Sequence, residues 1–499
     1  MVFSSLVFLY LFLPLTLLLY YAAPRRLRNP VLLVMSLLFY GWGEPRGVVI
    51  MLITCIVNFA CAKTIYQHPD SPRLRKAALI VSVVVSLGIL GYFKYAGFAA
   101  ENLPFIAGLG LPAVALPIGI SFYTFQAMSC TIDVYRGKVD AAPGFIGYTT
   151  YVTLFPQLIA GPIVRYQQIA DQLIHRRESA DRFAAGVGTF VCGLCKKVLL
   201  ANQFGALFDQ VQAMEDPSAL SALFGLLCFT MQIYFDFSGY SDMAIGLGRF
   251  FGFELPINFN YPYISRSITE FWRRWHISLG MWFREYVYIP LGGNRGGTVR
   301  MLRNIFIVWC LTGLWHGASW NFVLWGLYYG ILLLLEKVVW RQWLAGVFEA
   351  RGIRLPGWLA HVYTMVLVVQ GWALFSFTDL AALGGFLAAL FGANGLCDSW
   401  VLYQAATCLP LLVAGVIGCT PLPKKIWNRL VGAAGNNTDP AQATANSADG
   451  LQISGNNTAA PQTTSRGAWL IPVAVIAGLL ICTAFLVNAS YNPFLYFRF

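Results

Sequence analysis

The chain has 499 residues, of which 58% are hydrophobic and only 11% are charged. A soluble chain of this length would form about three domains with roughly 25% charged residues. This chain has too few charged residues to cover a surface that faces water. The 34 Lys and Arg residues outnumber the 22 Asp and Glu residues, but they lie in short loops between apolar runs, as cytoplasmic loops of membrane proteins do. The composition therefore predicts an all-α polytopic membrane protein and argues against a nucleic-acid partner.

The N-terminal residues are expected to form the first membrane span. Residues 1–21 are apolar, no basic residue precedes them, and Arg25, Arg26 and Arg28 follow them. A cleaved signal peptide has the opposite order of charge. We therefore interpret this segment as a retained span whose arginines face the cytoplasm.

Similar apolar runs recur along the chain and predict about ten to twelve membrane-spanning helices plus several half-helices. Some runs are shorter than the roughly 20 residues that cross about 30 Å of hydrocarbon. The run at 111–125 contains Pro112 and Pro117 and is expected to be re-entrant, because irregular backbone at membrane depth must be covered by protein or water. The predicted spans cover approximately residues 4–22, 30–43, 47–66, 77–95, 111–128, 145–163, 183–202, 219–237, 303–317, 319–336, 358–377, 400–419 and 468–487.

Two groups of polar or reactive residues precede the middle of the chain. Cys192 and Cys195 have CxxC spacing, but no second pair and no histidine accompany them, so packing is favoured over metal or redox chemistry. Asp236 and Tyr240 lie in the sequence Tyr-Phe-Asp-Phe-Ser-Gly-Tyr-Ser-Asp at the end of an apolar run, which predicts the edge of a polar pocket. Asp236 suits either the orientation of a histidine or arginine or a structural ion pair, and the ion pair is favoured.

Residues 261–303 are unusual because seven arginines gather there. Ser267 and Glu270 fit a capping box, and Pro290 with the glycines after it ends the apolar periodicity, so one helix is predicted from Ser267 to about Ile289. His276 falls at the edge of its aromatic face. A basic, Trp-rich helix is typical of the membrane surface, but arginines beside a water-filled cavity also suit the phosphates of a ligand. The arginines are Arg266, Arg273, Arg274, Arg284, Arg295, Arg300 and Arg303.

A second candidate centre is His316, within the sequence Thr-Gly-Leu-Trp-His-Gly-Ala-Ser-Trp-Asn at residues 312–321. It lies deep in an apolar stretch, where ionisable residues are costly and usually functional. Gly313 and Gly317 flank it and permit a helix break or the close approach of a substrate. The residues alone leave two interpretations open, a functional histidine and a neutral histidine hydrogen-bonded between helices.

A low-complexity segment precedes the last predicted span. Residues 431–466 are rich in Asn, Thr, Ala and Gly and hold too few apolar residues to order themselves. Asn436 and Asn456 match the glycosylation pattern, but the preceding lysines predict a cytoplasmic loop, so we discount the match. We expect a membrane core over residues 1–430, this linker over 431–466, and a final helix with a tail over 467–499.

Several motifs, in the same order along the chain, resemble those of the membrane-bound O-acyltransferase family, in its bacterial branch of alginate O-acetyltransferase-like proteins. The sequence Phe-Trp-Arg-Arg-Trp-His-Ile-Ser-Leu at 271–279 and the segment around His316 are the most specific. The sequence Pro-Gln-Leu-Ile-Ala-Gly-Pro at 156–162, the cluster around Asp236 and the C-terminal Asn-Pro-Phe-Leu-Tyr-Phe-Arg-Phe also match. The linker is longer than the family pattern.

The resemblance implies a ring of tilted helices around a thinned membrane centre, with a tunnel between the two faces, in a multi-pass protein of the bacterial inner membrane. It implies an enzyme without cofactor or metal that transfers an acyl group, usually acetyl, from cytoplasmic acetyl-coenzyme A to a hydroxyl of an extracytoplasmic glycan or to a partner transferase. His316 would be the general base and His276 a second polarising or orienting group; an acyl-histidine intermediate stays open. The predicted substrate-binding residues are Arg273, Arg274, Arg284, Trp315, Asn321, Asp236 and Tyr240.

Two rival functions remain open. A transporter or flippase for a lipid-linked saccharide would use the same spans with His316 as a proton relay, although the internal repeats typical of transporters are not visible. A non-catalytic scaffold in an envelope-polysaccharide export complex is the other. Both predict that His316→Ala leaves acetyl transfer and acetyl-coenzyme A hydrolysis unchanged.

Overall fold

The computed structural model describes residues 1–108, 115–139, 144–338, 356–432, 467, 469–488 and 495. Within these ranges the chain forms helices joined by mostly short loops, without a β-strand, so the expected all-α class is confirmed. Nearly all of the predicted linker, including Asn436 and Asn456, lies outside the described residues. So do residues 111–114 of the segment expected to be re-entrant.

The first half of the chain builds part of the surroundings of the candidate site, including α4, α6 and α13. Proline occupies the first turn of several of them, where its missing N–H and fixed φ are tolerated. In chain order these elements are η1 (Phe8–Phe12), α1 (Leu13–Ala22), η2 (Arg25–Leu27), α2 (Arg28–Gly41), α3 (Pro45–Gln67), α4 (Pro72–Asn102), α5 (Pro104–Ala107), α6 (Ile120–Tyr135), α7 (Phe145–Thr153), α8 (Phe155–Leu158), α9 (Tyr166–Ile169), α10 (Gln172–His175), α11 (Ala180–Cys195), η3 (Lys196–Ala201), α12 (Asn202–Gln212) and α13 (Ala219–Phe250).

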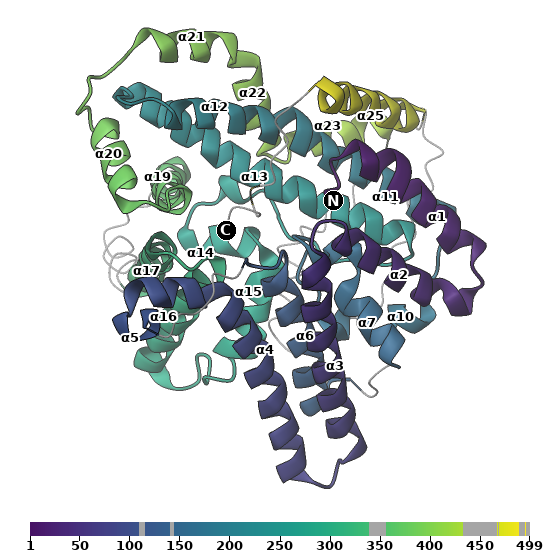
Figure 1. Ribbon diagram of the computed structural model, residues 1–499. Coiled ribbons are helices and arrows are strands. Elements are labelled where there is room, and N and C mark those ends of the chain that lie inside the picture. Colours follow the sequence, from purple (N-terminus) through teal and green to yellow (C-terminus); the bar gives the residue numbers. More distant parts are fainter. Residues whose placement is uncertain are drawn as a thin grey trace.

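The second half carries both candidate histidines, and its last described helix comes back beside α11 of the first half (Figure 1). Its elements are η4 (Pro262–Ile264), α14 (Ile268–Arg274), α15 (Ile277–Phe283), η5 (Arg284–Tyr288), α16 (Gly297–His316), α17 (Trp320–Leu335), α19 (Gly357–Ser376), α20 (Leu380–Leu390), α21 (Ser399–Thr407), α22 (Leu409–Gly418), α23 (Leu422–Val431) and α25 (Leu470–Asn488).

Seven of the described helices are long and apolar enough to cross a membrane, and the pair α21–α22, bent by 63°, would make eight. The chain is therefore a multi-pass membrane protein. The sequence-based number of ten to twelve is higher because several apolar runs form short helices. One example is α6, which has 16 residues and is almost wholly covered by other parts of the protein. The seven helices span Pro45–Gln67, Pro72–Asn102, Ala180–Gln212, Ala219–Phe250, Trp320–Val338, Gly357–Ser376 and Leu470–Asn488.

Helix α13 lies in the middle of the molecule (Figure 1) and is the most buried of these spans. Glycines let α11 pack directly against it. A Cβ added at Gly193 would lie 2.5 Å from the carbonyl oxygen of Gly239, and one at Gly246 would lie 2.6 Å from that of Gly186. Small residues permit this approach of helix backbones in membranes. The crossing fixes α13, which carries Asp236.

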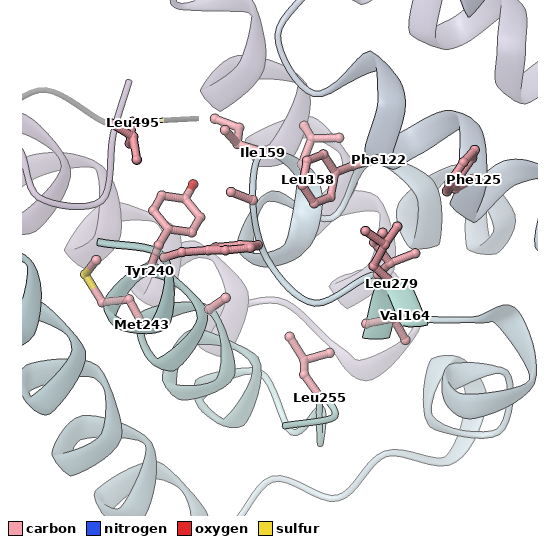
Figure 2. Packing of buried hydrophobic residues seen from close by; sticks show 14 of the residues in the cluster. Phe122, Phe125, Leu158, Ile159, Val164, Tyr240, Met243, Leu255, Leu279 and Leu495 are labelled. Carbon is pink, nitrogen blue, oxygen red and sulfur yellow. The ribbon is translucent and has the colours of Figure 1, made fainter. Parts of the chain in front are cut away.

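The segment at 154–164, which includes one of the family-like motifs, is buried along its whole length. Figure 2 shows its Leu158 beside Phe122 of α6 and its Val164 beside Leu279 of α15. The apolar side chains of this segment therefore lie against both α6 and α15. The motif forms part of the buried packing between these two helices.

The basic loop after α1 is tied to the loop before α11. Arg28 forms an ion pair with Glu178 at 2.7 Å, and the hydroxyl of Tyr20 donates a hydrogen bond to the same carboxylate at 2.6 Å. Burial alone would raise the pKa of Glu178, but the hydrogen bonds from Tyr20 and Arg28 bring it below its usual value. The carboxylate stays charged and anchors Arg28, one of the three arginines predicted to face the cytoplasm.

Candidate active site

The helix predicted from Ser267 to Ile289 is interrupted, and the prediction of one continuous helix is wrong. Ser267 caps its start as expected by accepting the N–H of Glu270 at 3.0 Å, whereas the Glu270 carboxylate accepts from the N–H of Arg266 at 2.9 Å and does not close the predicted capping box. Helix α14 ends at Arg274, and α15 starts at Ile277 after a reversal of the backbone. The last turn is a π-helix, η5.

The interruption is centred on His276, whose φ of 43° and ψ of 53° place it in the left-handed region. Among non-glycine residues, His, Asn and Asp are the ones enriched there. Asn258 holds this conformation, because its carbonyl accepts the N–H of Ile277 at 3.0 Å. Its side-chain Oδ1 lies 3.2 Å from His276 Nδ1 and accepts the hydroxyl of Ser278 at 2.9 Å. An upstream loop thus imposes the break.

His316 is the last residue of α16, and the chain leaves the helix at Gly317. A glycine crossing sets its position. A Cβ added at Gly313 would lie 2.5 Å from the carbonyl oxygen of Phe322 in α17, and one at Gly326 would lie 3.0 Å from the Cα of Gly313. The break expected from the flanking glycines is confirmed, and it turns the chain directly from α16 into α17.

Two side chains of α4 hold the carbonyl end of α16. Lys94 Nζ donates to the carbonyl of Trp315 and to that of His316, the latter at 3.2 Å. The hydroxyl of Tyr95 donates to the carbonyl of Leu314. The last carbonyls of a helix have no partner within the helix and carry partial negative charge. A lysine from another span therefore satisfies them and fixes the backbone of His316.

The imidazole of His316 is surrounded by aromatic rings. Its centroid lies 5.0 Å from that of Trp315, 4.9 Å from Trp325 and 5.2 Å from Phe375, each in an edge-on arrangement. Within the described ranges neither ring nitrogen has a hydrogen-bond partner. The side chain is 8% exposed, and it faces a cavity of about 10 Å³. Among the described residues, the structure therefore shows no hydrogen bond of the kind expected for the structural histidine considered from the sequence.

The structure brings the two histidines together across one indole. The ring of Trp315 lies 5.0 Å from His316 and 5.9 Å from His276. His276 is also buried, with Phe237 at 4.7 Å, and its Nε2 has no partner among the described groups. The two positions singled out from sequence, 40 residues apart, therefore contact the same indole ring.

Asp236 lines the same cavity as His316, together with Trp275, Trp372 and Leu495. Its carboxylate forms an ion pair with Lys197 at 2.6 Å, and both side chains are nearly inaccessible. It also accepts the backbone N–H of Leu495 at 2.8 Å. The structural ion pair that the sequence favoured is present, and the carboxylate also fixes a C-terminal residue at the cavity.

The three predicted phosphate-binding arginines differ in their exposure and in their partners. Arg274 is engaged within its own region, donating to Glu270 at 3.0 Å and to the carbonyl of Asn260 at 3.1 Å. Arg273 is exposed. Arg284 lies beyond the break, on η5, half-exposed beside Glu285 at 3.3 Å. The left-handed turn at His276 separates the first two from the third.

Of the other predicted substrate-binding residues, only Trp315 contacts both histidines. Asn321 is fully buried and donates to the carbonyls of Leu374 and Phe375 at 3.3 and 3.4 Å, so it clamps α17 to α19. Tyr240 stacks on Phe3 at 4.4 Å, and Figure 2 shows it within the buried apolar packing. In the structure these two side chains make packing contacts.

Cys192 is exposed, and Cys195 Sγ lies 3.6 Å from Cys482 Sγ of α25. The described part of the chain contains no group of His, Cys, Asp or Glu residues that could hold a metal ion. The residues that sequence reasoning missed are Lys94 and Asn258. Lys94 could have been noticed in the sequence, because a charge within an apolar run is costly. Asn258 lies in a loop where no sequence feature distinguishes it.

Comparison with known proteins supports the same part of the chain as the functional unit. Residues 119–377 match the model of the membrane-bound O-acyltransferase family. This range contains both histidines, Asn258 and Asp236.

Curated relatives extend the similarity over the whole chain. The chain is 39% identical, with complete coverage of both sequences, to a Pseudomonas aeruginosa protein named probable alginate O-acetylase. It is 32% identical to a Helicobacter pylori peptidoglycan O-acetyltransferase, over 79% of this chain and 81% of that protein. A Bacillus subtilis teichoic acid D-alanyltransferase is 28% identical over 52% of this chain and 68% of its own length.

Proposed function

Because the chain belongs to the membrane-bound O-acyltransferase family, we propose that it transfers an acetyl group from cytoplasmic acetyl-coenzyme A to a hydroxyl of a glycan outside the cytoplasmic membrane, directly or through a partner transferase. The observation that carries this proposal is the pair of buried histidines on either side of Trp315. The names of the relatives fit it, since they describe acyl transfer to hydroxyl-bearing envelope polymers.

The chemistry requires little beyond alignment and one proton acceptor, because a thioester is already activated. A lone pair of the His316 imidazole takes the proton of the acceptor hydroxyl while the oxygen of that hydroxyl forms a bond to the acetyl carbonyl carbon. The C–S bond then breaks, and the imidazolium passes the proton to the sulfur, which leaves as the thiol of coenzyme A. A neutral imidazole suits this role because it both accepts and returns a proton near neutral pH. The absence of a hydrogen-bond partner for His316 among the described residues leaves its lone pair available.

Arg273 and Arg284 are more suitable than Arg274 for the phosphates of the donor. Arg273 is exposed, and Arg284 is half-exposed on η5. Arg274, in contrast, is bound to Glu270. An arginine binds phosphate best when its N–H fork is not already used by a carboxylate. Arg284 has one Glu285 contact at 3.3 Å, longer than a strong charge-assisted bond.

The test is acetyl transfer by purified protein in proteoliposomes with labelled acetyl-coenzyme A and a short hydroxyl-bearing glycan. Release of coenzyme A and the formation of an O-acetyl ester are followed together. Both should be present in the wild type and absent in His316→Gln, with donor binding retained. A transporter or scaffold would show the same coenzyme A release in both proteins, and this outcome would exclude acyl transfer.

The polymer acceptor is identified in cells. Mass spectrometry of the envelope polymers, from strains with wild-type protein or the His316→Gln variant, should show one class of O-acetyl ester that disappears in the variant. If every ester persists, the protein is not the source of envelope acetylation.

A further inference from the structure

The loop between α13 and η4 places the side chain of Asn258 against the ring of His276. Asn258 Oδ1 receives the backbone N–H of Ser278 at 3.2 Å. A backbone N–H can only donate, so the atom that faces it must be the oxygen of the amide and not the nitrogen. The orientation of the Asn258 amide is therefore fixed independently of the histidine.

A second contact agrees with this orientation. The Ser278 hydroxyl accepts the N–H of Ile163 at 2.9 Å and lies 2.9 Å from Asn258 Oδ1, to which it can donate its hydrogen. Turning the amide around would place Asn258 Nδ2 against the backbone N–H of Ser278, which can only donate, and this is unfavourable.

His276 Nδ1 lies 3.2 Å from this same oxygen. Because Oδ1 can only accept, Nδ1 must carry the hydrogen. A neutral imidazole has one N–H, so Nε2 has the lone pair. Nε2 is buried and has no partner among the described residues, and the ring lies between Phe237 and Trp315 at 4.7 and 5.9 Å.

We propose that Asn258 is a positioning residue that locks His276 in its Nδ1–H tautomer, so that Nε2 accepts a hydrogen bond from the acyl-acceptor hydroxyl. This proposal rests on the proposed function and narrows it. Polarisation of the thioester carbonyl would require an N–H at the free nitrogen, and the lock removes it. His276 orients the hydroxyl, and His316 removes its proton.

The tautomer can be measured without any assay of activity. The chain has five histidines, so uniform 15N-histidine labelling of the protein in lipid bilayers gives few signals, and His276→Asn identifies those of His276. Wild-type protein should show a protonated Nδ1 and an unprotonated Nε2. A protonated Nε2 in the wild type would overturn the proposal.

Variants of Asn258 separate the lock from simple packing. Asn258→Leu keeps the volume but accepts nothing, so signals of the Nε2–H form should appear. Asn258→Asp keeps an acceptor and should retain the Nδ1–H form. The matched control is Asn58→Leu, which removes an equally buried asparagine bonded to Ser82 and Ser86 in α4 and should leave the His276 signals unchanged. An unchanged tautomer in Asn258→Leu contradicts the proposal.

Turnover tests the second half of the proposal. Asn258→Leu should lower kcat about tenfold with little change in the KM for acetyl-coenzyme A, and Asn258→Asp should recover most of that loss. Equal kcat in the wild type and in Asn258→Leu, despite a changed tautomer, would refute the orienting role. If wild-type protein transfers no acetyl group at all, the proposed function fails, while the 15N spectra still decide whether Asn258 locks the tautomer.

Discussion

The two buried histidines are held by different atoms. His316 is 8% exposed and His276 is 3% exposed, yet the protein fixes the backbone of the first and the ring of the second. At His316, Lys94 binds the carbonyl oxygens while the imidazole meets aromatic faces and a cavity. At His276, Asn258 binds Nδ1 directly. This difference suits two different roles: the ring of His316 is free to exchange a proton, and the ring of His276 is held in one orientation.

That division also explains the contrast in local backbone. His316 ends a regular helix, where the carbonyl groups need outside partners. His276 sits in a left-handed turn, a conformation that costs a non-glycine residue roughly 1–2 kcal/mol and that is retained when surrounding contacts enforce it. The contacts that enforce this turn therefore also fix the ring of His276. The predictions that follow test each part of this comparison.

The largest effect is expected at His316. His316→Gln removes the proton acceptor but keeps a similar volume, and loss of a general base lowers the rate by about 10²–10⁴-fold. The thermal midpoint should change little, because the ring makes no hydrogen bond within the described ranges. Acetyl transfer in proteoliposomes measures the first effect and thermal unfolding in detergent the second. His175→Gln, at an exposed histidine of α10 paired with Asp171, should retain full activity; equal activity in both variants would disprove the assignment of the base.

A smaller loss of activity is expected on substitution of His276. The effect on kcat should differ from the effect on the free energy of unfolding. His276→Asn keeps a residue that tolerates the left-handed region, so kcat should fall about 10²-fold through misplacement of the acceptor with little loss of stability. His276→Ala should show the same kcat and a further loss of roughly 1–2 kcal/mol in the free energy of unfolding. Chemical or thermal unfolding in detergent compares the two. Equal stability of both variants would mean that the turn is not strained.

Membrane residence, the helix start at Ser267 and the break after His316 could all be predicted from sequence, because each depends on neighbours in the chain. A low fraction of charged residues indicates a protein surrounded by lipid. A serine before a helix can accept a backbone N–H only three residues away, and a glycine permits a helix break at its own position. The pairing of the two histidines came only from the family resemblance. The hydrophobic periodicity predicts helices but does not predict that residues 276 and 316 lie close together.

The left-handed turn at His276 could not be predicted in the same way. Aromatic residues continue at helical spacing across it, so the pattern favours an unbroken helix, and the residue that imposes the break is 18 positions upstream. Lys94 is still more remote, 222 positions from His316. Contacts between distant segments decide both features, so neither could be predicted from the local sequence pattern.

The glycine crossing at Gly313 tests whether helix spacing positions His316. Gly313→Ala would put a Cβ 2.5 Å from the carbonyl oxygen of Phe322, and overpacking of this kind costs about 1–3 kcal/mol. Gly88→Ala on α4 is the matched control, since no heavy atom lies within 4 Å of its added Cβ and alanine favours the helix by up to about 1 kcal/mol. Thermal unfolding and acetyl transfer are measured for both. A Gly313→Ala protein as stable and active as the Gly88→Ala protein would show that the crossing does not position the histidine.

The smallest effect is expected at Lys94, where the contact with His316 runs only through backbone. Lys94→Met removes the donor to two terminal carbonyls of α16, and a cation at a helix C-terminus contributes about 0.3–2 kcal/mol. Loss of this anchor should loosen the end of the helix and lower kcat roughly threefold to tenfold, because small displacements of a catalytic group are costly. Lys94→Arg keeps donors and should recover part of the loss, whereas Lys63→Met, at an exposed lysine of α3, should change neither kcat nor the thermal midpoint. If Lys94→Met lowered kcat as far as His316→Gln, the lysine would have to act on the reacting groups themselves, and the separation between an anchored backbone and a free ring at His316 would no longer hold.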